Sequence, residues 1–111
     1  MNKIKMICLD IDGTLLNSQH KISQKTNDII RIVASVKQIP VILVSARMPK
    51  GILFLQKELN INEPIICYSG ALVIDAKANI LSSSGIATSD VVRPYSFAKE
   101  LNVHMSLYKD D

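Results

Sequence analysis

Ile7–Leu16 reads ICLDIDGTLL, and this stretch decides the fold. The apolar, β-branched run Ile4–Leu9, which overlaps the start of this stretch, predicts a strand that leads directly into two carboxylates at positions i and i+2. Alternate residues of an extended chain project to the same side, so Asp10 and Asp12 are expected to converge just past the carboxyl end of that strand. Gly13 permits the sharp chain reversal that keeps both acids there. Open α/β sheets bind their ligands at this edge.

Two converging carboxylates indicate a divalent cation, a phosphoryl group, or both. The alternative is an idle surface turn, because isolated D-x-D pairs are common in solvated loops. The placement of Asp10 and Asp12 favours the functional interpretation, since an apolar strand precedes them and Gly13-Thr14-Leu15-Leu16 follows without a gap.

Together with this first strand, the residues up to Tyr68 predict a β-α-β-α-β order. Ser23 is suited to cap a helix that continues to Gln38, with apolar residues at helical spacing. Val41–Val44 is an apolar strand of the kind buried in parallel sheets. A helix over Pro49–Leu59 and a strand over Ile65–Tyr68 follow.

The last forty residues begin with a predicted hairpin. It pairs Ala71–Ile74 with Ile80–Leu81, and a small-residue stretch, Ser82–Gly85, follows it. Ser89 or Ser96 and the run to Leu101 predict a helix, and Pro94 fits its first turn better than its interior. The alternation in Val103–Tyr108 predicts a strand.

A second polar group follows the strand that ends at Val44. The hydroxyl of Ser45 can donate to a phosphoryl oxygen, and Arg47 can neutralise its charge. The alternative is that Ser45 only caps the next helix. Parallel strands end at one edge, so Ser45 is expected beside Asp10.

The D-x-D-G-T string, here Asp10 to Thr14, resembles the signature of the haloacid dehalogenase superfamily of phosphatases. The Leu15-Leu16-Asn17 continuation is most similar to its Cof-like sugar-phosphatase branch. The resemblance implies an α/β fold: a Rossmann-like parallel sheet with helices on both faces, plus the beginning of an α/β cap domain. It implies that residues 1–82 form the N-terminal part of the core domain. Residues 83–111 are then a linker and the first helix and strand of the cap.

The resemblance also implies the chemistry. Asp10 is the expected nucleophile that forms an aspartyl-phosphate, and Asp12 the expected general acid and base. Mg²⁺ is expected on the Asp10 carboxylate and on Asp12, through its main-chain carbonyl. The expected phosphate- or substrate-binding residues are Thr14, Ser45, Ala46, Arg47, Ser69 and Gly70, where Ala46 replaces the glycine of the family's T-G-R motif and Ser69 the asparagine of its N-G-A segment. The implied activity is magnesium-dependent hydrolysis of small phosphorylated metabolites such as sugar phosphates.

Composition narrows the class of protein. The chain of 111 residues is 48% apolar with a net charge of +3, and it has no basic run, so nucleic-acid binding is not expected. Its start is neither a signal peptide nor a membrane span, so a cytoplasmic protein without a membrane partner is expected. Cys8 and Cys67 are expected to be small buried thiols. His20 and His104 are expected to be surface or packing residues.

Two motifs that the family needs do not occur in the sequence: the lysine that follows the cap, and a G-D-x-x-N-D segment. The chain therefore resembles the front of a longer phosphatase, cut inside its cap. An alternative is a catalytically incompetent fragment, or a binding module that keeps only part of the phosphate site. A receiver-type phosphoacceptor domain is a more distant alternative. An isolated chain of this kind is expected to self-associate.

Overall fold

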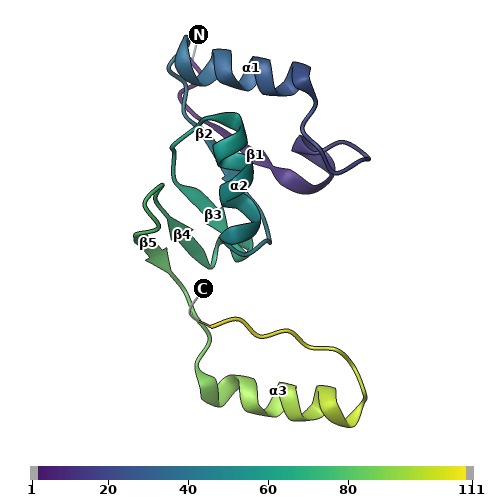
Figure 1. Cartoon of the computed structure of the whole chain (residues 1–111). Coiled ribbons are helices and arrows are strands. Elements are labelled where there is room, and N and C mark those ends of the chain that lie inside the picture. The colour runs from purple at the N-terminus through teal and green to yellow at the C-terminus, as the bar shows by residue number, and fades with distance from the viewer. Residues whose placement is uncertain (1–2, 110–111) are drawn as a thin grey trace.

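The structure is a computed structural model, and it describes residues 3–109. Figure 1 shows a layered α/β body and a separate C-terminal arm. The strands are β1 (Ile7–Asp10), β2 (Val41–Val44), β3 (Ile65–Cys67), β4 (Leu72–Ile74) and β5 (Ile80–Ser83); the α-helices are α1 (Gln24–Ser35), α2 (Lys50–Leu59) and α3 (Thr88–Glu100).

The five strands form one sheet in the order β1-β2-β3-β4-β5. The first three are parallel, with Asp10 opposite Val44 and Val44 opposite Ile66. The predicted hairpin of β4 and β5 continues the sheet in antiparallel fashion. The predicted α/β class and the parallel arrangement of the first three strands are confirmed, and the sheet as a whole is mixed.

The core lies between the sheet and the two helices α1 and α2. Alternate residues of β2 and β3 are buried on this face, and they share one apolar cluster with the helices: Val41, Leu43, Ile65 and Cys67 from the strands, and Ile30, Ile52, Leu55 and Leu59 from α1 and α2. Both helices cover the same face because the two parallel crossovers run in one direction along the sheet with the same hand. The expectation of helices on both faces is therefore not met within residues 3–109.

The opposite face of the sheet is less covered. Ile42, Val44 and Ile66 are only half-buried, and Cys8 is exposed. The expectation of a buried Cys8 is wrong, because β1 is an edge strand and its Ile7 and Leu9, not Cys8, pack against the core cluster.

Local signals set the ends of the elements. The Ser23 side chain accepts a hydrogen bond from the Thr26 N–H at 3.2 Å and caps α1, as expected. The helix ends at Ser35, before Gln38, whose φ of 53° lies in the left-handed region. In the hairpin, the Asp75 carboxylate accepts from the backbone N–H groups of Lys77 and Asn79, which closes the turn.

The C-terminal arm departs most from expectation. Because α3 begins at Thr88, Pro94 lies inside the helix and not in its first turn. Proline has no N–H, so the carbonyl of Asp90 loses its helical partner, and water can replace that partner at this exposed position.

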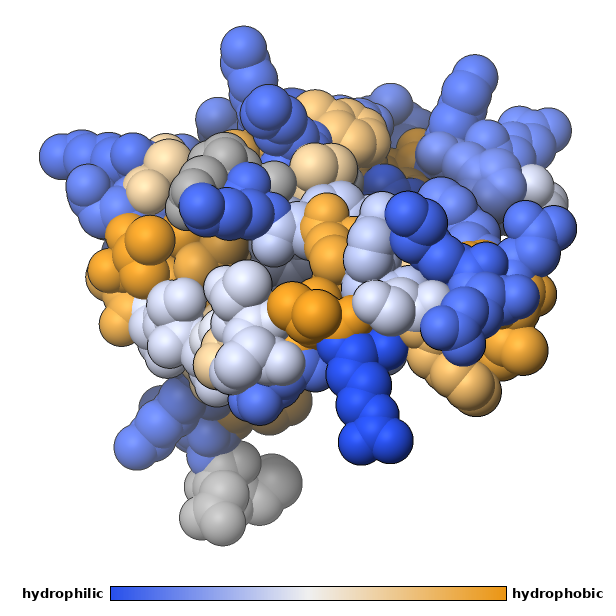
Figure 2. Space-filling view, turned by 90° about the horizontal axis from the view of Figure 1, so that it is seen from below, coloured by the Kyte–Doolittle hydropathy of each residue, from blue (hydrophilic) through white to orange (hydrophobic). Residues whose placement is uncertain are grey.

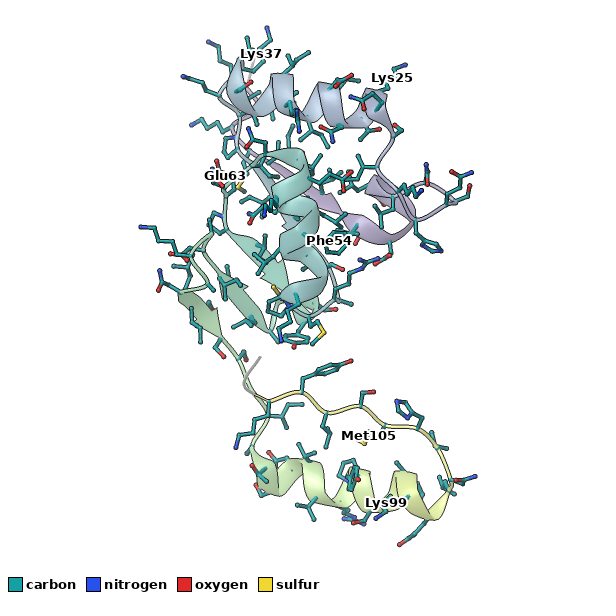
Figure 3. All side chains as sticks on the ribbon, in the orientation of Figure 1. Lys25, Lys37, Phe54, Glu63, Lys99 and Met105 are labelled. Atoms are coloured by element: carbon teal, nitrogen blue, oxygen red, sulfur yellow. The ribbon has the colours of Figure 1, made fainter. Side chains whose placement is uncertain are left out.

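The strand expected at Val103–Tyr108 is not formed. The segment runs extended beside α3, and no strand of the described chain pairs with it (Figure 1). Met105 is half-buried between the segment and α3 (Figure 3). The arm contacts the body through the rings of Tyr108 and Tyr68, whose centroids lie 5.3 Å apart.

The arm makes the molecule extended. The radius of gyration is 17.0 Å, whereas a compact chain of this length has about 13 Å. The view from the side of α3 shows hydrophobic side chains at the surface among polar ones (Figure 2). The exposed apolar residues of the arm include Val92, Phe97, Leu101 and Leu107.

Candidate active site

The carboxyl ends of β1, β2 and β3 meet at one edge of the sheet, as the parallel arrangement requires. Asp10 ends β1, and Ser45 follows β2 directly. The Ser45 N–H donates to the Ile66 carbonyl, and the Ser69 N–H donates to the Ser45 carbonyl, both at 3.0 Å. These bonds hold the loops after β2 and β3 together beside Asp10.

An open cavity of about 400 Å³ lies at this edge. It is lined by Asp10, Val44, Ser45, Ala46, Ile66, Ser69 and Gly70. Five of the residues expected at a phosphate site therefore share one cavity. Asp12, Thr14 and Arg47 do not line it. A larger hollow along α3 contains none of the expected site residues.

Ser45 is the buried hydroxyl of the cavity, only 4% exposed. Its Oγ accepts from the Arg47 N–H at 3.1 Å. The alternative role as cap of α2 is wrong, since the N-cap of that helix is Pro49. The bond from Arg47 uses a lone pair, so the hydroxyl hydrogen can still be donated to an oxyanion.

The segment that follows β3 and forms one wall of the cavity has an unusual backbone conformation. Tyr68, Ser69 and Gly70 have φ values of 48°, 55° and 100° in succession. A left-handed conformation costs a residue with a side chain about 1–2 kcal/mol, whereas glycine adopts it freely. A hydrogen bond that the Tyr68 N–H donates to the Arg47 carbonyl, at 3.0 Å, stabilises this strained conformation. Backbone strain that the surroundings enforce is common at binding sites.

The turn after β1 presents its polar residues to solvent. Ile11–Leu15 forms a tight turn whose backbone leaves helical geometry at Asp12 and at Gly13, which has a φ of 79°, as the expected reversal requires. Ile11 and Leu15 are buried and anchor this turn in the core. Asp12 and Thr14 are consequently exposed beside the site.

Asp12 and Arg47 form a two-point ion pair. The guanidinium donates from Nε to Oδ2 at 2.8 Å and from Nη2 to Oδ1 at 2.6 Å. This hydrogen bonding lowers the pKa of Asp12 and raises that of Arg47. Asp12 is therefore a carboxylate at neutral pH, the form that accepts a proton. The sequence suggested phosphate as the partner of Arg47, and no local signal indicated this contact across 35 positions.

The oxygen atoms near the cavity could provide part of the ligand shell of a magnesium ion. Residues 3–109 contain no group of three or more histidine, cysteine, aspartate or glutamate side chains able to hold a metal. The Asp12 carboxylate is engaged by Arg47, which leaves Asp10 as the carboxylate at the cavity. Magnesium commonly binds one or two carboxylates and completes its octahedral shell with water and phosphate oxygens. The Asp10 carboxylate at the cavity fits this pattern of ligands.

The histidines lie outside this cavity. His20 lies in an exposed turn with a φ of 56°, and His104 lies on the arm, 2.9 Å from the Ser106 hydroxyl. Neither lines the cavity.

The fold and the cavity define an α/β protein with a candidate anion site at the carboxyl ends of its parallel strands. The sequence model of the haloacid dehalogenase-like hydrolase family matches residues 7–111 of this chain. The chain belongs to this family, which confirms the resemblance drawn from Asp10–Thr14.

Individual relatives agree with the family. A Haemophilus influenzae protein named "Putative phosphatase" is 36% identical over 88 residues, 79% of this chain and 33% of its own. A Persephonella marina glucosyl-3-phosphoglycerate/mannosyl-3-phosphoglycerate phosphatase is 36% identical over 65% of this chain and 26% of its own. The crystal structure of a haloacid dehalogenase-like hydrolase from Bacteroides thetaiotaomicron superposes with a TM-score of 0.80 at 28% identity, covering 90% of this chain and 39% of that one.

The chain thus spans between a quarter and two fifths of the length of these relatives. Within residues 3–109, no helix has the length and apolar character needed to cross a bilayer.

Proposed function

We propose that the complete natural protein carrying this chain is a phosphatase that hydrolyses small phosphorylated metabolites such as sugar phosphates. The observation that carries the proposal is the single cavity shared by the Asp10 carboxylate and the Ser45 hydroxyl, with the ionised Asp12 on the adjoining turn. The name of the Persephonella marina relative, which specifies two sugar-linked phosphate esters, supports this substrate class.

The reaction has two steps. A carboxylate oxygen of Asp10 attacks phosphorus, and the bond from phosphorus to the leaving oxygen breaks. Asp12, which takes up a proton from solvent before this step, passes that proton to the leaving alkoxide. Water then attacks the aspartyl-phosphate, Asp12 accepts its proton, and Asp10 is regenerated with release of inorganic phosphate.

The other residues of the site bind and orient the phosphoryl group. The Ser45 hydroxyl donates to a phosphoryl oxygen, and the backbone around Ala46, Ser69 and Gly70 shapes the cavity that receives it. Thr14, on the exposed turn, contacts the group from the Asp10 side. Such positioning and charge stabilisation provide most of the catalysis in phosphoryl transfer.

Magnesium is the proposed cofactor. The Asp10 carboxylate and the main-chain carbonyl of Asp12 would hold it. When bound, it supplies positive charge that offsets the repulsion between phosphate and the attacking carboxylate.

The proposed organisation follows the family. Residues 1–82 form the N-terminal part of the core domain, and residues 83–111 form a linker and the beginning of a cap. The Tyr68–Tyr108 contact, which joins the arm to the wall of the cavity, supports a cap that lies near the site. We place the protein in the cytoplasm, where cysteine thiols such as those of Cys8 and Cys67 stay reduced.

A second candidate function is a binding module without turnover. It is favoured by the lack, within residues 3–109, of any group of three or more histidine, cysteine, aspartate or glutamate side chains that could hold a metal. The 111-residue chain alone would then bind phosphate weakly at Asp10 and Ser45, and its exposed apolar arm would drive self-association.

A metal-dependence assay separates the two candidates. The complete natural protein is expected to hydrolyse a panel of sugar phosphates with Mg²⁺, to lose about a hundredfold in rate when EDTA removes the metal, and to recover when Mg²⁺ is restored, because the ion offsets several kcal/mol of charge repulsion. Hydrolysis at the same rate in EDTA would exclude the magnesium role. Phosphate binding without any turnover would favour the module.

A further inference from the structure

Arg47 is held at three points in the structure. Two of its nitrogens bind the two oxygens of Asp12, and the third, Nη1, donates to the Gly51 carbonyl at 3.2 Å. Its side chain is 29% exposed and does not line the cavity where phosphate is proposed to bind. The guanidinium is therefore committed to a neighbouring side chain and not to the cavity.

Gly51 provides the space for this arrangement. A Cβ built on Gly51 would lie 3.3 Å from the Cβ of Arg47, closer than ordinary van der Waals contact, and 3.4 Å from its Cδ. Gly51 lies in α2 without a positive φ, so backbone conformation does not require glycine at this position. The missing side chain lets the stem of Arg47 lie against the first turn of the helix.

Asp12 needs such support. Its side chain is 54% exposed on a turn, where an aspartate has several accessible rotamers. A two-point pair with a planar guanidinium fixes the orientation of the whole carboxylate. Because a carboxylate offers about four lone-pair positions, two remain for proton transfer.

We infer that Arg47 is a positioning residue that orients the Asp12 carboxylate for proton transfer and does not bind the phosphoryl group. The inference rests on the proposed function and assigns Arg47 a role in that same site. The guanidinium of Arg47 is the link between α2 and the turn after β1, and Gly51 determines where it lies.

The first test separates turnover from phosphate binding in the complete natural protein. Arg47→Met is expected to lower kcat about 10- to 100-fold, since a small misplacement of a catalytic group has effects of this size. KM and the Kd of inorganic phosphate, measured by titration calorimetry, are expected to stay within about twofold, because no phosphate ligand is lost. Arg47→Lys keeps the charge without the two-point geometry. Its kcat is expected to lie between that of the natural protein and that of Arg47→Met. Lys50→Met, which removes an exposed cation three residues away, is the matched control and leaves kcat unchanged.

A second variant tests the same inference without removing any charge. Gly51→Ala displaces Arg47 by a few tenths of an ångström, while alanine favours the helix over glycine. A lower kcat with an undiminished melting temperature would support positioning, because lost stability cannot explain it.

The pair also predicts non-additivity. In an Asp12→Asn background, Arg47→Met is expected to cause no further loss of kcat. An Arg47→Met enzyme with unchanged kcat, or with a phosphate Kd raised tenfold or more, would overturn the inference. Either result leaves the proposed function intact, whereas full turnover by an Asp10→Asn variant would reject the proposed function itself.

Discussion

Asp10→Asn in the complete natural protein is expected to lower turnover of sugar phosphates by about 10⁴-fold or more, the scale of losing a catalytic nucleophile. The amide has the shape of the carboxylate, but it lacks the negative oxygen that attacks phosphorus. Asp10 is exposed at the end of β1, so the substitution is not expected to disturb the core. Steady-state rates with Mg²⁺, together with the melting temperature, measure both effects.

Asp28→Asn is the matched control for that variant. Asp28 is an exposed aspartate on α1 that accepts a hydrogen bond from Gln24, and it is absent from the cavity. Its substitution is expected to leave turnover within about twofold. Equal rates for Asp10→Asn and Asp28→Asn would show that Asp10 is not the nucleophile.

Leu43→Ala is expected to lower the free energy of unfolding by about 2–5 kcal/mol. Leu43 is fully buried in β2, inside the cluster that joins the sheet to α1 and α2. The lost methyl groups leave a cavity that the surrounding strands cannot fill completely. Because Ser45 follows the same strand, weaker packing of β2 also loosens the site.

Leu81→Ala removes the same atoms from an exposed position. Leu81 lies in β5 and is 57% exposed, so its truncation is expected to change stability by no more than about 0.5 kcal/mol. Urea unfolding of both variants gives the comparison. Similar losses for Leu43 and Leu81 would contradict the assignment of the core to the α1–α2 face.

The sequence predicted the elements whose signals are local. The apolar runs of β1 and β2, the Ser23 cap and the hairpin of β4 and β5 each specify their own structure within a few residues. Position in the sheet was less predictable: Cys8 lies in an apolar run, yet it is exposed because β1 is an edge strand.

The arm was the least predictable part. The alternation in Val103–Tyr108 is a strand pattern, but a strand forms only where another strand offers hydrogen bonds, and residues 3–109 supply none there. Pro94 was expected in a first turn, but α3 begins six residues before it.

The candidate site also has a part that the sequence predicted and a part that it did not. That parallel strands end together was enough to place Asp10 and Ser45 on one cavity, whereas Ser69 was expected there only from the resemblance to the N-G-A segment. The Asp12–Arg47 pair could not be foreseen, because it depends on side-chain directions in two loops that the fold brings together.

Trapping the covalent intermediate tests the central claim most directly. The complete natural protein would be mixed with Mg²⁺ and a sugar phosphate, quenched in acid during turnover, digested and analysed by mass spectrometry. A phosphoryl group on the peptide that contains Asp10, and on none from an Asp10→Asn control, is the expected result. Rapid turnover with a phosphoryl group on another residue would contradict the role given to the ICLDIDGTLL stretch.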